Sequence, residues 1–231
     1  MKSISIFFPC YNEEKNIATL VEKTIRTISQ FSDNYEIIIV NDGSKDKTSI
    51  VANNLALKNK NIRVINHLKN RGYGAALKSG FSNSTKDLIF YTDGDGQFDI
   101  QEIEKLLPLI EDYDIVTGYR MNRRDNILRK LNGFLWTKLT TLVFDFKVRD
   151  VDCAFKLYRK KVFDGMELES EGAFLNTEIF AKARKNGFTI KEIGVHHYPR
   201  LAGKQTGAKL KVIIRAFYEL FKFRKKIKKS F

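Results

Sequence analysis

Two aspartates separated by one residue, Asp93 and Asp95, are the residues of this 231-residue sequence best suited to chemistry. They lie in the segment Asp93-Gly94-Asp95-Gly96-Gln97, where glycines leave both carboxylates uncovered. Carboxylates this close repel each other, so a divalent cation placed between them and a ligand phosphate would stabilise the arrangement. Gln97 could add a neutral oxygen. An acidic turn explains the same residues without a metal, because Asp-Gly pairs are common in turns.

Three further clusters carry polar or charged side chains. They are Pro9-Cys10-Tyr11-Asn12-Glu13, Asn41-Asp42-Gly43-Ser44 and Asn70-Arg71-Gly72-Tyr73-Gly74. Asp42 could accept a hydrogen bond from a base or a ribose, or Ser44 or Asp46 could cap a following helix. Glu13 and Tyr11 are equally open to structural roles. The third cluster has neither the spacing of a dinucleotide fingerprint nor that of a phosphate-binding P-loop.

Each of the four clusters follows a short run rich in Ile, Val and Phe. The runs are Ile4–Phe8, Glu36–Val40, Ile62–Asn66 and Leu88–Thr92, and they predict four buried strands. Helical patterns lie between them, so the sequence predicts an α/β fold with a mostly parallel sheet flanked by helices. Ligands of such sheets bind beyond the carboxyl ends of the strands. The four clusters should therefore meet at one edge of the sheet.

The second half of the chain has a less regular pattern. It predicts strands at Asp114–Tyr119, Phe155–Tyr158 and Ile190–His196, with helices at Leu131–Phe144 and Thr177–Asn186. A final helix should begin near Leu210. Its apolar residues share one face, opposite lysines and arginines, and they are Val212, Ile213, Phe217, Leu220 and Phe221. This pattern is typical of a helix that lies in a membrane interface.

The positive charge of the chain is concentrated at its C-terminal end. The net charge is +14, and eleven lysines and arginines with one acid, Glu219, occur from Arg200 onward. Nucleic acid and an anionic membrane surface both attract such a segment. The nearly neutral remainder shows no pattern for reading bases, so we expect no nucleic-acid partner. We also expect no membrane-spanning helix, and the two cysteines, Cys10 and Cys153, fit a reducing compartment.

In order and content the four clusters resemble the family 2 glycosyltransferases of the GT-A fold. Within that family they look most like the dolichol-phosphate mannosyltransferase and polyprenyl-phosphate glycosyltransferase branch. The resemblance continues through Val116–Arg120, Asp150–Lys156 and Glu192–Gly203, and it covers nearly the whole chain up to about Gly207. It implies a Rossmann-like GT-A domain over residues 1–207, followed by a basic amphipathic C-terminal helix and tail over residues 208–231.

The resemblance implies a role for each matching residue. The positions that hold the nucleotide base and ribose are matched by Pro9, Tyr11, Glu13 and Asp42. Those that hold Mg²⁺ or Mn²⁺ against the diphosphate are matched by Asp93, Asp95 and Gln97. Arg120 and Arg200 match arginines that receive the acceptor's phosphate, and Asp150 matches an acid discussed as a base or an acceptor-positioning group. Lys204 lies earlier than the family's usual lysine after Arg-x-x-Gly and is the candidate to replace it as a binding residue, and Ala154 replaces a usual glycine.

The implied activity is a metal-dependent, inverting transfer of a sugar. The donor would be a GDP- or UDP-sugar, and the acceptor a polyprenyl (dolichyl or undecaprenyl) phosphate at the cytoplasmic face of a membrane, with the protein bound peripherally. A lipid phosphate is already anionic at neutral pH, so arginines would position it and a strong general base is less necessary.

Two other enzyme activities compete with this interpretation. A glycosyltransferase that uses a hydroxyl acceptor, in polysaccharide or glycoconjugate synthesis, would need Asp150 or Asp152 as a true base. A sugar-1-phosphate nucleotidyltransferase predicts a glycine-rich first loop with a basic residue, whereas this chain has Pro9-Cys10-Tyr11-Asn12-Glu13.

Overall fold

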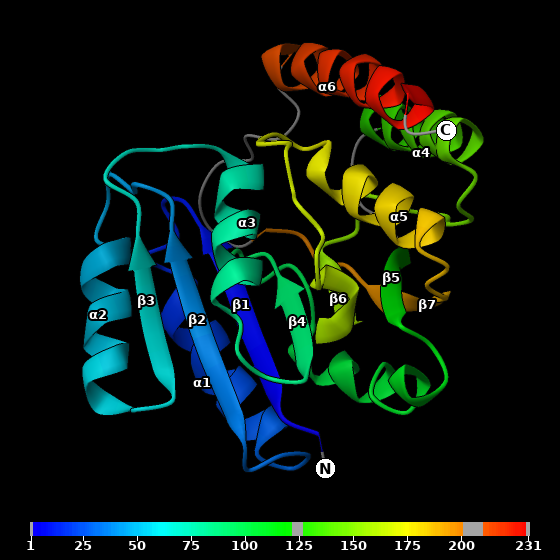
Figure 1. The fold of residues 1–231 in the computed structure, drawn as a ribbon. Coiled ribbons are helices and arrows are strands. Elements are labelled where there is room, and N and C mark those ends of the chain that lie inside the picture. The colour runs from blue at the N-terminus through cyan, green and yellow to red at the C-terminus, as the bar shows by residue number, and fades with distance from the viewer. Residues whose placement is uncertain (1, 122–126, 201–209, 230–231) are drawn as a thin grey trace.

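One seven-stranded sheet organises the chain (Figure 1), in a computed structural model that describes residues 2–121, 127–200 and 210–229. The strands lie in the order β3-β2-β1-β4-β6-β5-β7. Their bounds are β1 Ile4–Cys10, β2 Tyr35–Asn41, β3 Ile62–Asn66, β4 Leu88–Thr92, β5 Ile115–Met121, β6 Phe155–Arg159 and β7 Ile190–His196. All seven strands predicted from the sequence are therefore confirmed, with ends that differ by at most two residues.

Helices cover both faces of this sheet, as predicted. Their bounds are α1 Ile17–Ile28, α2 Thr48–Lys58, α3 Tyr73–Asn83, α4 Ile127–Phe144, α5 Leu175–Lys185 and α6 Leu210–Lys229, with short 3-10 helices at Ile100–Lys105, Leu109–Glu111 and Lys160–Phe163. In Figure 1, α3 lies in front of the sheet and α1 behind it. The α1 helix buries Ile17, Leu20, Val21 and Ile28, whose spacing of three and four residues places them on one side of a helix.

The directions of the strands explain why the chemistry gathers at one edge. The four strands β1 to β4 all run in the same direction, and β5 is parallel to β7. The strand β6 runs antiparallel to β4 and β5, so Phe155 at its start pairs with Thr92 at the end of β4. The segment before β6 therefore lies at the same edge as the segments that follow the parallel strands.

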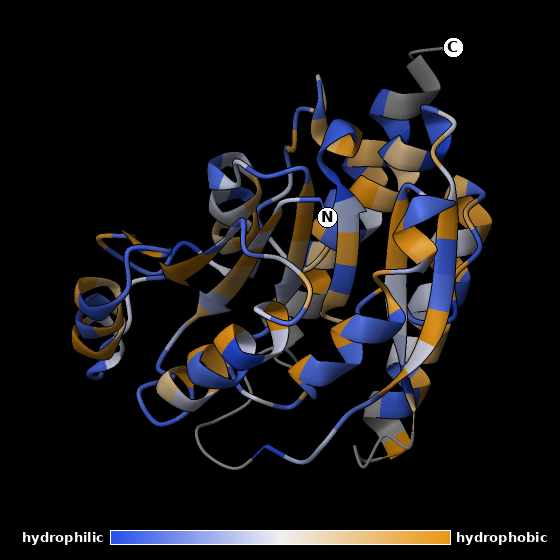
Figure 2. Ribbon diagram, turned by 90° about the horizontal axis from the view of Figure 1, so that it is seen from below, coloured by the Kyte–Doolittle hydropathy of each residue, from blue (hydrophilic) through white to orange (hydrophobic). Residues whose placement is uncertain are grey.

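The core is built from strands that are buried on both sides. Every residue of β1 and β4 is buried, because helices cover both faces of these central strands. In Figure 2 hydrophobic residues run along the strands, whereas hydrophobic and hydrophilic residues alternate on the helices. Phe7, Phe81 and Tyr91 form an aromatic cluster between β1, α3 and β4, with ring centroids 4.9–5.6 Å apart. A Cβ at Gly80 would lie 2.3 Å from the Phe7 ring, so α3 can approach β1 only with glycine at this position.

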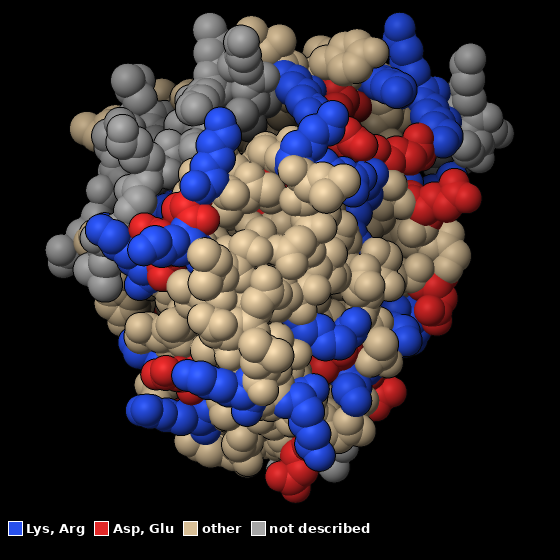
Figure 3. Space-filling view, turned by 90° about the vertical axis from the view of Figure 1, so that its left-hand side faces the viewer, with Lys and Arg blue, Asp and Glu red and all other residues tan. Residues whose placement is uncertain are grey.

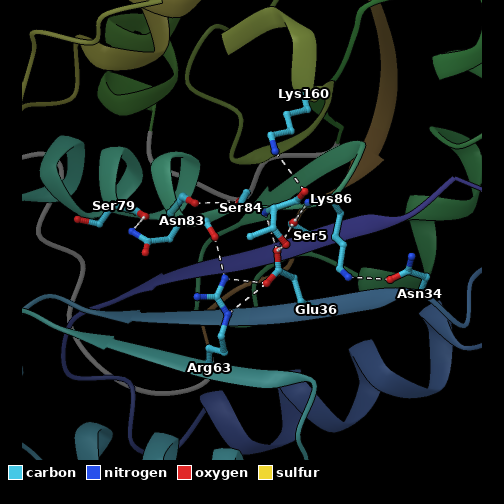
Figure 4. A network of polar contacts seen from close by, with 11 residues as sticks. Ser5, Asn34, Glu36, Arg63, Ser79, Asn83, Ser84, Lys86 and Lys160 are labelled. Carbon is cyan, nitrogen blue, oxygen red and sulfur yellow. Dashed lines mark hydrogen bonds and ion pairs between the residues drawn. The ribbon is translucent and has the colours of Figure 1, made fainter. Parts of the chain in front are cut away.

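The edge of the sheet opposite the polar clusters holds a network of its own (Figure 4). Glu36 accepts hydrogen bonds from Ser5 Oγ at 2.6 Å and from the backbone N–H of Thr85 at 2.7 Å, and it forms an ion pair with Arg63 at 2.7 Å. Burial alone would raise the pKa of Glu36, but these donors stabilise the anion and lower the pKa to about 2. The network joins β1, β2, β3 and the segment before β4.

The C-terminal helix α6 packs on α4 and α5. Trp136 of α4 contacts Phe217 with ring centroids 5.3 Å apart, and Phe223 contacts Phe174 at 5.5 Å. The residues of the apolar face predicted for this helix do not all have the same environment. Leu220 is buried against the body of the molecule, whereas Phe221 is exposed. Within the described residues, no helix is long and apolar enough to cross a membrane.

Charges of both signs mix on the surface over α2 and β3. Figure 3 shows this face with lysines, arginines and acids around an uncharged centre. A nucleic-acid backbone is usually followed by a continuous basic stripe, and the described residues form none on this face.

Candidate functional site

The loops that follow β1 and β2 are joined to each other by hydrogen bonds. Asn12, which has a positive φ of 60°, donates its backbone N–H to Ser44 Oγ at 3.0 Å. The next residue, Glu13, donates its backbone N–H to Thr48 Oγ1 at 2.7 Å. These bonds fix the backbone beside Tyr11, and they direct the Glu13 carboxylate toward the carboxyl edge of the sheet. Pro9 and Tyr11 flank Cys10, the last residue of β1.

Asp42 is surrounded by hydrogen-bond donors of this chain. Its carboxylate accepts the backbone N–H groups of Arg71 and Gly72, both at 2.9 Å, and contacts His67 Nδ1 at 2.6 Å. His67 Nε2 in turn lies 2.9 Å from Ser79 Oγ. Asp42 therefore organises the loop before α3. Sequence reasoning missed His67, although its position directly after β3 places it at the same edge.

The two aspartates after β4 lie in contact with the end of β1. Gly94 donates its backbone N–H to the Pro9 carbonyl at 3.3 Å, and a Cβ at Gly94 would lie 2.5 Å from Cys10 Sγ. Asp93 Oδ1 is buried and has no hydrogen-bond partner among the residues that the structure describes. Burial and the neighbouring Asp95 carboxylate raise the pKa of Asp93 to about 7. A buried carboxylate oxygen without a donor is costly, so this oxygen is suited to a ligand cation.

Gln97 ties the loop of the two aspartates to the segment after β7. Its backbone N–H donates to Asp95 Oδ1 at 3.1 Å, and its side-chain Nε2 donates to the Tyr198 carbonyl at 2.8 Å. Tyr198 returns a backbone hydrogen bond to the Gln97 carbonyl at 2.8 Å. The structure thus gives Gln97 an internal partner, and its role as a metal ligand stays a prediction.

The residues present fit a divalent cation that is shared with a bound phosphate. Among the described residues, no group of three or more His, Cys, Asp or Glu side chains could hold a metal by itself. Asp93 and Asp95 carry hard carboxylate oxygens, and one oxygen of Asp93 is buried without a hydrogen-bond partner among the described residues. Mg²⁺ and Mn²⁺ prefer oxygen ligands, and Mg²⁺ usually binds through one or two carboxylates together with substrate phosphates.

Arg200 reaches into this cluster of acids from beyond β7. Its guanidinium donates to Glu13 Oε1 through Nη2, and its Nη1 lies 3.4 Å from Asp95 Oδ2. Asn16 Nδ2 donates to the other oxygen of Glu13 at 2.7 Å. Arg200 is thus held by carboxylates of the first and fourth loops. The neighbouring Lys204, another predicted site residue, lies outside the described residues.

Arg120 and Asp150 form a bidentate ion pair. Asp150 accepts from Arg120 Nε and Nη2, both at 2.7 Å, and each side chain is only 10% exposed. Burial alone would lower the pKa of Arg120, but the contact with Asp150 raises it. Glu192 accepts the backbone N–H of Arg149 at 2.8 Å and so supports the turn that presents Asp150. Asp150 is thus the partner of a buried cation and uses both carboxylate oxygens in this pair.

Lys156 is a buried cation below the site that sequence reasoning also missed. Its side chain is fully buried, its Nζ donates to the Cys153 carbonyl, and it lies 3.2 Å from Tyr91 Oη. Burial lowers the pKa of Lys156. A lysine in a short, mostly apolar strand gives no signal of its own, because the sequence does not show which strand residues are covered on both faces.

Most of the predicted site residues meet at one edge. Hydrogen bonds and ion pairs connect the loops that follow β1, β4 and β7, and a backbone hydrogen bond connects the loop after β2 to the end of β1. The predicted site residues in these four loops are Pro9, Glu13, Asp42, Asp93, Asp95, Gln97 and Arg200. Arg120 and Asp150 form a second group from β5 and the turn before β6. Burial raises the pKa of Asp93, and the positive charge of Arg120 offsets a small part of this rise, so the second group lies close enough to the first to act on it electrostatically.

Comparison with protein families and curated proteins gives one consistent result. The family model described as "Glycosyl transferase family 2" matches residues 5–166. The chain is 32% identical over 224 residues to "Undecaprenyl-phosphate 4-deoxy-4-formamido-L-arabinose transferase" of Photorhabdus laumondii subsp. laumondii, which is 95% of this chain and 67% of that protein. The protein of the same name from Proteus mirabilis matches with the same identity and coverage.

Solved structures share the fold at lower sequence identity. Glucosyl-3-phosphoglycerate synthase from Mycobacterium tuberculosis, in complex with Mn²⁺, UDP and phosphoglyceric acid, superposes with a TM-score of 0.70 and 17% identity. The match covers 96% of this chain and 78% of that one. S. aureus TarS 1–349 in complex with UDP-GlcNAc has a TM-score of 0.64 and 16% identity, over 90% of this chain and 61% of that one. At these identities the likeness shows a common GT-A fold.

Proposed function

Because the chain belongs to glycosyl transferase family 2, we propose that it moves a sugar from a nucleotide-sugar donor to the phosphate of a polyprenyl phosphate, with Mg²⁺ or Mn²⁺. The observation that carries this proposal is the pair of aspartates at the carboxyl edge, of which Asp93 holds a buried oxygen that no donor of the described residues reaches. The names of the curated relatives, which are undecaprenyl-phosphate transferases, support the choice of acceptor.

The donor would bind over the loops after β1, β2 and β4. Tyr11, Glu13 and Asp42 would contact the nucleoside, and Asp93 and Asp95 would hold the cation. When bound, the cation neutralises the diphosphate as it leaves. The structural neighbours with the same fold were crystallised with UDP or with UDP-GlcNAc, so UDP is the first nucleotide to test and GDP the second.

The acceptor would bind beside Arg120 and Arg200. An acceptor phosphate oxygen forms a bond to the anomeric carbon of the sugar while the bond from that carbon to the diphosphate oxygen breaks, and this single displacement inverts the anomeric configuration. The oxygen is already ionised, so no proton has to be removed. The Arg120–Asp150 pair supports an anionic acceptor, because an acid held by two arginine N–H groups is a poor general base.

The donor site is tested by calorimetric titration of UDP and GDP with Mn²⁺ or with a chelator. We expect one nucleotide to bind only with the metal, and at least about tenfold more weakly to Asp95→Asn, because one of two metal ligands is weakened. Asp33→Asn, an exposed acid in the turn before β2, is the matched control and should bind like the wild type. Metal-independent binding, or equal binding by Asp95→Asn, would refute the metal site.

The acceptor is tested with a matched pair of lipids, undecaprenyl phosphate and undecaprenol. We expect transfer to the phosphate only, with a product of inverted anomeric configuration. Transfer to the alcohol would instead support the hydroxyl-acceptor alternative, and it would require a base at the site. Retention of configuration would contradict a single displacement.

The outer faces of α4 and α6 support a membrane surface as a further partner. On α4 the exposed apolar side chains are Ile127, Leu131, Phe134, Leu135 and Leu142, and on α6 they are Ile214, Phe217, Tyr218 and Phe221. The two helices contact each other through Trp136 and Phe217. In Figure 1, α6 lies at the end of the molecule to which the arrows of β1 to β4 point. Lys138, Lys222 and Lys225 accompany this surface, so we propose peripheral binding to anionic lipid at the cytoplasmic face.

A further inference from the structure

Two carboxylates of the proposed donor site enclose the guanidinium of Arg200. Its Nη2 donates to Glu13 and its Nη1 lies 3.4 Å from Asp95 Oδ2. The three side chains are at most 13% exposed, so this cluster lies largely out of water. Buried acids remain ionised only when opposite charges are close to them. Among the described residues, Arg200 is therefore a counter-ion that the chain itself supplies to both Glu13 and Asp95.

The backbone near Arg200 is fixed to the loop that carries Asp95. The Tyr198 N–H donates to the Gln97 carbonyl at 2.8 Å, and Gln97 Nε2 donates to the Tyr198 carbonyl at 2.8 Å. Arg200 begins two residues beyond this anchor. Its long side chain can therefore reach a different partner through rotamer changes, without movement of the sheet.

Asp95 has two competing uses. Its Oδ2 faces the guanidinium of Arg200, and its carboxylate is one of the two proposed to bind a divalent cation. A cation bound by Asp95 would stand within a few ångströms of the guanidinium. Repulsion between like charges at this range is strong where water is largely excluded. The cation is therefore favoured when Arg200 has left Asp95 or when a diphosphate supplies compensating negative charge.

We propose that Arg200 exchanges partners during the reaction cycle: it neutralises Glu13 and Asp95 in the ligand-free chain, leaves them when the metal and the nucleoside diphosphate bind, and then binds the phosphate of the acceptor. The proposal rests on the proposed function, since both ligands are those of a polyprenyl-phosphate glycosyltransferase. It couples the two sites, so donor binding strengthens acceptor binding. Linkage requires that the acceptor strengthens donor binding by the same factor.

The first test measures the affinity of Mn²⁺ alone, by electron paramagnetic resonance of the free ion. The full-length wild type is compared with Arg200→Gln, Arg200→Lys and Arg63→Gln. The last variant is a matched control, since it removes the same charge from the ion pair with Glu36 at the opposite edge. We expect Mn²⁺ to bind Arg200→Gln at least fivefold more tightly, and both Arg200→Lys and Arg63→Gln within twofold of the wild type.

An unchanged or weaker Mn²⁺ affinity of Arg200→Gln overturns the exchange. The same holds if Arg63→Gln gains as much as Arg200→Gln, since the effect would then be one of net charge. If Arg200→Gln does not fold, as judged by circular dichroism, the second test below decides, because it can be carried out with the wild type and with Arg200→Lys.

The second test titrates farnesyl phosphate, with and without UDP and Mn²⁺, and uses inorganic phosphate as a probe of the headgroup alone. We expect UDP with Mn²⁺ to increase the affinity of the wild type and of Arg200→Lys, which keeps the positive charge, for both phosphates at least fivefold, and this increase to be lost in Arg200→Gln. Equal affinities with and without UDP and Mn²⁺ refute the exchange. A wild type that binds no nucleotide with Mn²⁺ refutes the proposed function instead, so the two failures are distinguishable.

Discussion

The Arg120–Asp150 pair shows how single side chains fix the electrostatics of this site. Both groups are almost completely removed from water, and both hydrogen bonds between them are 2.7 Å long. A buried charge is strongly destabilising once its partner is removed. The charge of each residue therefore depends on the other. Asp150 could act as a base only while it is also the partner of Arg120.

A double-mutant cycle tests this unit. We expect Asp150→Asn and Arg120→Gln each to lower the free energy of unfolding by about 3–5 kcal/mol, because each leaves one buried charge unpaired. The double variant should lose clearly less than the sum of the two. Urea denaturation followed by circular dichroism gives all four values. Additive losses would mean that the two side chains act separately in solution.

The contacts between individual side chains of the site are what the sequence predicts least well. Aspartates near strand ends could be recognised from the sequence, because their position follows from the apolar runs before them. Their partners could not, because Arg200 lies 187 positions from Glu13 and Arg120 lies 30 from Asp150. Only the folded chain brings these groups together, and a pattern of residue types contains no information about such distances.

Among the elements, α3 has two glycines that are required for different reasons. A Cβ at Gly74 would lie 2.4 Å from the backbone of Glu171, and a Cβ at Gly80 would lie 2.3 Å from the ring of Phe7. The first contact is near the loop that Asp42 organises, and the second is in the core. The same substitution at the two positions should therefore have different consequences.

We expect Gly74→Ala and Gly80→Ala each to destabilise the protein by about 1–3 kcal/mol, since the added methyl has no space. Alanine in an ordinary helix interior would instead stabilise by up to about 1 kcal/mol. Only Gly74→Ala should also weaken UDP binding, which calorimetry would measure. Ser82→Ala, an exposed change on the same helix, is the control for stability. If the two glycine variants bound UDP equally well, the contact between Gly74 and Glu171 would have no influence on the donor site.

The network around Glu36 predicts a pH dependence of stability. The pKa of Glu36 is lowered from 4.5 to about 2 in the folded chain, so its contribution is complete above about pH 5 and is lost as the pH falls toward 2. We expect Glu36→Gln to cost about 1–2 kcal/mol at pH 7, after allowance for screening by solvent. The difference from the wild type should shrink below pH 4 in thermal unfolding. A constant difference from pH 7 to pH 3 would contradict the lowered pKa.

The prediction of elements succeeded where apolar runs are short and bounded by polar residues. The bounds predicted for β3, β4 and β7 are those of the structure. The helix α4 begins at Ile127 and not at Leu131, and Ile127 itself is exposed, so the apolar pattern of a packed helix does not mark this start. The reversed direction of β6 was not predicted, since an apolar run reads the same for either direction of a strand.

For the whole molecule, the exposed apolar faces of α4 and α6 predict where a membrane would make contact. We expect Leu142→Ser and Phe221→Ser each to lower partitioning onto vesicles that contain phosphatidylglycerol by about tenfold, because each removes apolar area worth about 1.5 kcal/mol. Vesicle flotation measures this partitioning. Leu57→Ser, an exposed leucine on α2, is the matched control and should bind like the wild type. Equal losses for all three variants would place the membrane contact elsewhere.

The reversed strand β6 also dictates the order in which a chain emerging from the ribosome can fold. The strands β1 to β4 are complete after residue 92, whereas β5 lies between β6 and β7 in the described sheet and must wait for them. The half with the paired aspartates can therefore form first during synthesis. Until residues 155–159 appear, the apolar strand β4 stays an open edge. Nascent chains of this length are thus the ones most exposed to aggregation, and a chaperone would protect them at β4.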